Sequence, residues 1–69
     1  MTRTNKTHDT SMACTIERLT FHREMELIHA ANSTARGETA EAAFRTRMAA
    51  GIQESIDSHT AWIAARMAN

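Results

Sequence analysis

Apolar residues recur about once per helical turn through the C-terminal half of the chain, and the sequence contains no proline to interrupt them. A helix that buries one face repeats its apolar residues at this interval. We therefore predict one long amphipathic helix over about residues 38–67, with Phe44 among its core side chains. The row expected to be buried consists of Ala40, Phe44, Met48, Ile52, Ile56, His59, Ile63 and Met67.

Residues 12–31 predict a second, shorter helix, whose apolar side chains fall into two groups on nearly opposite faces. A surface helix of a monomer normally shows one apolar stripe about 100° wide. Two stripes indicate two neighbours: the long helix, and either a symmetry mate or a foreign partner. The alternative is that this helix is irregular or shorter. One group is Met12, Ile16, Leu19 and Leu27, and the other is Cys14, Phe21, Met25 and Ile28.

The segment from Asn32 to Gly37 is expected to connect the two helices, because glycine and asparagine favour helix ends and turns. Helices joined by so short a segment are antiparallel neighbours. Residues 1–10 are polar and lack periodicity, so we expect a flexible arm before a single domain over residues 11–69. The predicted fold class is all-α: an antiparallel helical hairpin that self-associates into a four-helix bundle or a larger helical oligomer.

Length and composition favour this self-association, with a homodimer as the expected assembly. A chain of 69 residues buries a marginal core on its own, and Cys14 is its only cysteine, which excludes an internal disulfide. Eight basic and eight acidic residues give no basic patch of the kind that binds nucleic acid. No apolar run approaches a membrane span or a signal peptide. The expected localisation is cytoplasmic.

The long helix is predicted to span about 45 Å and the shorter one about 30 Å. Trp62, Ile63 and Met67 would then project beyond the shorter helix, and such an apolar cluster usually marks an interface. A second copy, a foreign partner or the folded-back arm could cover it. Gly51 in the helix interior indicates either a close approach by another helix or a tolerated defect. The predicted partner-binding residues are Trp62, Ile63, Met67, Phe21, Met25 and Ile28.

His22, Glu26 and His29 share one helix face, within an arc of roughly 60°. Imidazole and carboxylate groups at this spacing can share a metal ion, although an ordinary polar face has the same pattern. No catalytic constellation is evident. Cys14 has no histidine at helical contact spacing, and three consecutive residues such as Asp57, Ser58 and His59 point in different directions on a helix.

The sequence therefore predicts a non-enzymatic protein-interaction module without a cofactor. Small charge-neutral helical chains of this kind are frequent among inhibitors and adaptors encoded by phages and mobile elements, which is an argument from size and class. The alternative is a helical oligomer that binds a metal or a small anion between subunits. The metal ligands would be His22, Glu26 and His29, and the anion would bind arginines such as Arg45, Arg47 or Arg66.

Overall fold

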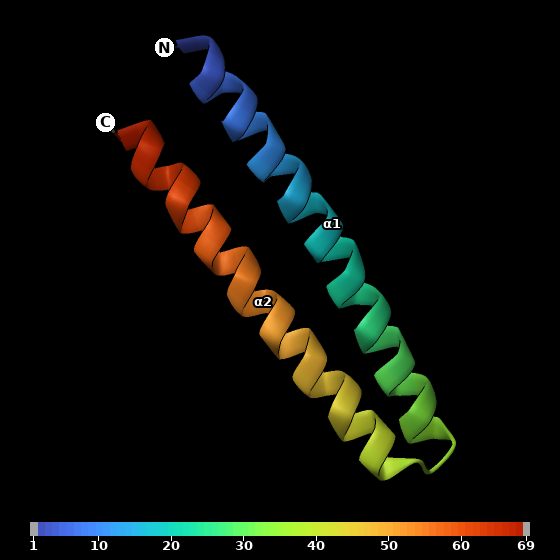
Figure 1. Ribbon diagram of the computed structural model, residues 1–69. Helices are drawn as coiled ribbons and strands as arrows, with labels where there is room; N and C mark the ends of the chain where they lie inside the picture. Colours follow the sequence, from blue (N-terminus) through green and yellow to red (C-terminus); the bar gives the residue numbers. More distant parts are fainter. Residues whose placement is uncertain (1, 69) are drawn as a thin grey trace.

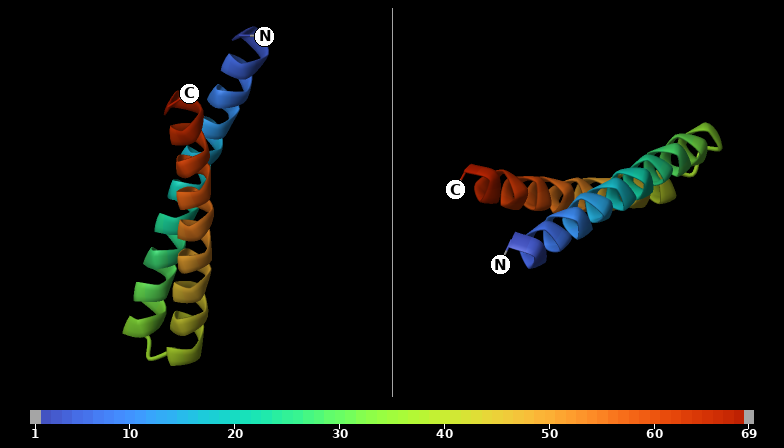
Figure 2. Two further views of the ribbon diagram at one scale, coloured as in Figure 1. Left: turned by 90° about the vertical axis from the view of Figure 1, so that its left-hand side faces the viewer. Right: turned by 90° about the horizontal axis from the view of Figure 1, so that it is seen from above.

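Two antiparallel α-helices form the protein, in a computed structural model that describes the backbone of residues 2–68 and the side chains of residues 11–68. Helix α1 spans Thr2–Ala35 and helix α2 spans Thr39–Ala68. They lie side by side along a rod of 54 × 15 × 11 Å, with both chain ends at the same end (Figure 1). Two further views show that the helices cross, so that the first turns of α1 lean away from α2 (Figure 2). The predicted all-α hairpin is confirmed.

Helix α1 is longer than the sequence predicts, because it starts at Thr2 instead of near Met12. Residues 2–10, expected as a flexible arm, continue the same helix, while Met1 lies outside the described residues. These residues contain neither glycine nor proline. Adding residues to an existing helix costs far less than starting a new one, so a polar segment can extend α1 without an apolar face of its own.

The turn between the helices is a Schellman motif centred on Gly37. The amide of Glu38 donates to the carbonyl of Ser33 at 2.8 Å, and the amide of Gly37 donates to the carbonyl of Thr34 at 3.0 Å. Gly37 has a φ of 76°, in the left-handed region that glycine adopts without strain. Its role as turn former is confirmed, whereas Asn32 lies inside α1 and does not end it.

We expect Gly37→Ala to lower the free energy of unfolding by about 1–2 kcal/mol, because an L-residue with a Cβ is strained in the left-handed conformation. Urea denaturation followed by circular dichroism measures the loss. Gly37→Asn is the matched control, since asparagine tolerates this conformation better and should lose less. Equal stability of the alanine variant and the wild type would contradict this account of the turn.

Each helix faces the other with a row of residues spaced alternately three and four apart. All members of both rows are buried or half-buried. This is the heptad spacing of two helices that pack along their whole length. We call these rows the inner seams. The α1 inner seam is Met12, Ile16, Leu19, Arg23, Glu26, Ala30 and Ser33, and the α2 inner seam is Ala42, Arg45, Ala49, Ile52, Ile56, His59, Ile63 and Arg66.

The two halves of the rod are packed differently. Near the turn, the buried side chains are small or charged: Ala30, Ser33, Ala42, Ala49 and Glu26. Toward the chain ends the seams carry larger apolar residues, of which Ile56 is buried. Small side chains bury little apolar area, so the half nearest the turn gains little hydrophobic stabilisation from packing within one chain.

Candidate functional site

A charged cluster lies between the helices near the turn. The Arg45 guanidinium donates through Nη1 to Glu26 Oε1 at 2.9 Å and through Nε to Glu41 Oε1 at 2.9 Å. These hydrogen bonds, first to Glu41 and then to Glu26, raise the pKa of Arg45 above its ordinary value. Glu26 is only 4% exposed, and Arg45 is its ion-pair partner from α2. The arginine therefore compensates a buried carboxylate and links the two helices.

This arrangement gives Glu26 a partner other than a metal. His22 and His29 are exposed, while the Glu26 carboxylate points into the helix interface. Among the residues whose side chains are described, no three His, Cys, Asp or Glu groups are placed to hold a metal ion. The structure therefore does not assemble His22, Glu26 and His29 into the metal site that their spacing permits.

The second apolar group of α1 faces away from α2, as the two-stripe pattern predicts. Phe21 is 69% exposed and Ile28 is 52% exposed, Cys14 is an exposed free thiol, and Met25 is half-buried. We call Cys14, Phe21, Met25 and Ile28 the α1 outer row. Beside it lies a shallow apolar depression of about 290 Å³, lined by Glu24, Leu27, Ile28 and Ala31.

The C-terminal cluster is placed differently from the prediction. Because α1 starts at Thr2, it extends at least as far as the end of α2 (Figure 1), so the last turns of α2, which carry Trp62 and Ile63, do not project beyond α1. Both residues are half-buried, with the Arg66 guanidinium 4.7 Å from the centre of the Trp62 ring. Met67 alone of the three is exposed. The expectation of an exposed three-residue cluster was wrong because it rested on a short first helix.

Helix α2 also carries an exposed apolar surface at positions that the sequence predicts to lie in the core. Phe44 is 46% exposed and Met48 is 40% exposed. The positions that are buried in their place are Ala42 and Ala49. The sequence of α2 does contain a signal that distinguishes its buried face from its exposed one. Residues spaced alternately three and four apart form two separate rows: the inner seam, and a second row that contains Phe44 and Met48.

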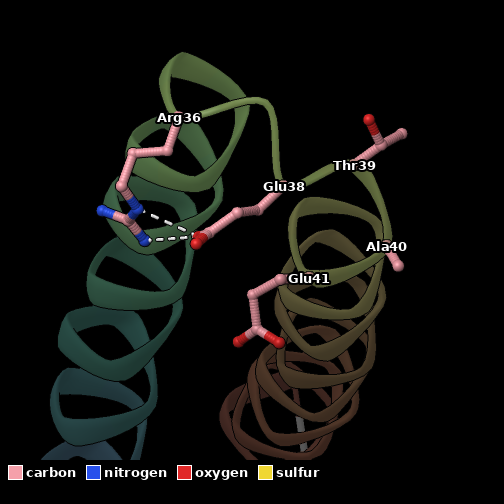
Figure 3. A pocket seen from close by; sticks show the side chains of 5 residues that line it. All are labelled: Arg36, Glu38, Thr39, Ala40 and Glu41. Carbon is pink, nitrogen blue, oxygen red and sulfur yellow. Dashed lines mark hydrogen bonds and ion pairs between the residues drawn. The ribbon is translucent and has the colours of Figure 1, made fainter.

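The hollow at the turn is charged and wide. Its volume is about 640 Å³, and its lining residues are Arg36, Glu38, Thr39, Ala40 and Glu41. Figure 3 shows Arg36 and Glu38 reaching toward each other across the turn, with Glu41 beside them; Arg36 Nη2 lies 2.8 Å from Glu38 Oε1. The arginine is thus already paired with a carboxylate, and two acidic residues line the hollow. None of the arginines predicted to bind an anion, Arg45, Arg47 and Arg66, lines this hollow.

Comparison of the chain with protein-family models, curated proteins and solved structures gave no match. Within residues 2–68, neither helix contains a stretch long and apolar enough to cross a membrane.

Proposed function

We propose that the protein is a small non-enzymatic interaction module, an inhibitor or adaptor, that self-associates and binds another protein through its helix surfaces. The supporting observation is that, near the turn, the usual distribution of buried and exposed side chains is reversed. The half of the rod near the turn buries alanine, serine and a glutamate, whereas Phe21, Ile28, Phe44 and Met48 stay on the outside. Large apolar side chains that stay exposed together on one helix face are candidates for a binding surface.

The surface for the foreign partner is the α1 outer row. Phe21 and Ile28 lie two helical turns apart on one face, where a helix presents its anchors to an apolar groove. Leu27 and Ala31 extend this face through the shallow depression beside Ile28. Large apolar side chains of this type supply most of the binding energy in protein interfaces, because they leave water completely when the partner covers them.

The test compares capture of a binding partner by the wild type and by the Phe21→Ala/Ile28→Ala variant. A protein retained from a lysate of source cells is purified, and its dissociation constant is measured by isothermal titration calorimetry. We expect the double variant to bind at least about tenfold more weakly, since two exposed anchors are lost. Alanine preserves helix propensity, so circular dichroism should show unchanged helicity.

Met67→Ala is the matched control, because Met67 is an exposed apolar residue at the other predicted partner-binding surface. It should leave the dissociation constant within about twofold. Weaker binding by Met67→Ala together with normal binding by the double variant would move the partner to the C-terminal end of α2 and contradict the assignment to α1.

A further inference from the structure

Helix α2 carries a second row of residues at the same alternating spacing as its inner seam. On a helix this row lies roughly 100° around from the inner seam, the angle at which a helix in a four-helix bundle meets its second neighbour. Its members are exposed except for Trp62, which is half-buried. We call it the α2 outer row, and it consists of Phe44, Met48, Gly51, Ser55, Ser58 and Trp62.

Gly51 in this row has no explanation within one chain. Glycine in a helix interior costs about 1 kcal/mol relative to alanine. A Cβ built at Gly51 would meet no atom within 4 Å, so close packing inside the hairpin does not require glycine there. A glycine on an exposed helix face gives room for a bulky side chain from another molecule.

We propose that a second copy of the chain covers the α2 outer row, with the two α2 helices antiparallel about a two-fold axis level with Ala49 and Ala50. This inference rests on the self-association proposed above and specifies its interface. In this register Phe44 faces Ser55 of the second copy, and Met48 faces Gly51 of the second copy. Both large side chains in this part of the row, Phe44 and Met48, then meet small ones, which allows close interdigitation.

Two charged residues select this register. Arg47 and Glu54 are exposed, flank the row on the same side one heptad apart, and have no hydrogen-bond or ion-pair partner among the described side chains. The two-fold axis brings Arg47 next to Glu54 of the second copy, and the symmetry forms this pair twice. Charges in these flanking positions commonly set the orientation of paired helices.

Neighbouring registers are less favourable for the same reason. A shift of one heptad in one direction places Glu54 beside Glu54 of the second copy, and the opposite shift places Arg47 beside Arg47. Like charges at such positions repel. A parallel arrangement would set Phe44 against Phe44 and Gly51 against Gly51. The two phenylalanine side chains would be overpacked, and the two glycines would leave a cavity.

The proposed dimer leaves a surface for the foreign partner. Its two α2 helices pack together and each carries its own α1, which gives a four-helix bundle. On a helical wheel the α1 outer row lies roughly 160° from the α1 inner seam. It therefore points away from the bundle, with Phe21 and Ile28 still accessible.

A charge-swap experiment tests the interface. The wild type, Arg47→Glu, Glu54→Arg and the double variant are compared by sedimentation velocity over a range of protein concentrations. We expect a dimer for the wild type and at least about a tenfold higher dissociation constant for each single variant, because each creates two like-charge pairs. The double variant should return to within about threefold of the wild type, since both pairs re-form with reversed polarity.

Two controls separate this interface from general charge effects. Glu17→Arg changes the charge as much as Glu54→Arg does, at an exposed position of α1 outside the α2 outer row, and should leave the dissociation constant within about twofold. Gly51→Leu fills the space for Met48 of the second copy and should dissociate the dimer while helicity is retained.

The possible failures are distinguishable. A monomeric wild type would overturn both the interface and the proposed self-association, without affecting partner binding by Phe21 and Ile28. A dimer in which the double swap fails to restore association, or in which Gly51→Leu has no effect, would overturn the proposed interface and register alone.

Discussion

Replacing Arg45 with methionine is expected to destabilise the hairpin more than any other loss of a charged side chain. Glu26 is 4% exposed and its ion-pair partner across the interface is Arg45. Removing the arginine would leave a buried carboxylate uncompensated, which is far more costly than losing an exposed ion pair. We expect the midpoint of thermal unfolding to fall by more than about 10 °C.

The same cluster predicts a recovery when both charges are removed. A buried ion pair replaced by apolar residues of similar volume is often neutral or more stable, because neither charge then has to be desolvated. Glu26→Leu combined with Arg45→Met should therefore regain most or all of the lost stability. Differential scanning calorimetry of the two single variants and the double variant measures this coupling.

Arg18→Met provides the control for loss of an arginine on the surface. Arg18 is exposed on α1, so its replacement should change the unfolding midpoint by no more than about 2 °C. A double variant as unstable as Arg45→Met would show that the ion pair itself, and not the unpaired Glu26, determines stability at this position.

The contact between Glu26 and Arg45 is a feature of the fold that the sequence did not predict. Periodicity gave α2 within one residue at each end, and Gly37 identified the turn. Glu26 was predicted to lie on one exposed face with His22 and His29, either as a metal ligand or as part of an ordinary polar face, because hydrophobic periodicity treats every charged residue as exposed. The structure buries it because the helix on the other side supplies Arg45, a contact that no single-helix pattern contains.

The buried face of α2 was misassigned for a geometric reason. Steps of four residues rotate by about 40° each on an α-helix, so the row from Ala40 to Ile56 winds through roughly 160°. A neighbouring helix cannot follow that row along its length. The observed seam alternates steps of three and four, which keeps it facing α1, and it buries Ala42, Ala49 and Ile56.

This difference leads to opposite expectations for two truncations in α2. Ile56 is 8% exposed and lies in the inner seam, so Ile56→Ala should lower the free energy of unfolding by about 2–4 kcal/mol. Phe44 was predicted to be a core residue, but it lies outside the inner seam and remains partly in water. Phe44→Ala should therefore cost less within a single chain, although phenylalanine is the larger side chain.

Urea denaturation at two protein concentrations distinguishes the two positions. The loss from Ile56→Ala should be the same at low and high concentration, because its contacts lie within one hairpin. The loss from Phe44→Ala should grow with concentration, because the proposed contact between Phe44 and Ser55 of the second copy exists only in the dimer. A concentration-independent loss of about 3 kcal/mol or more from Phe44→Ala would instead restore Phe44 to the core of the single chain and contradict its assignment to the outer row.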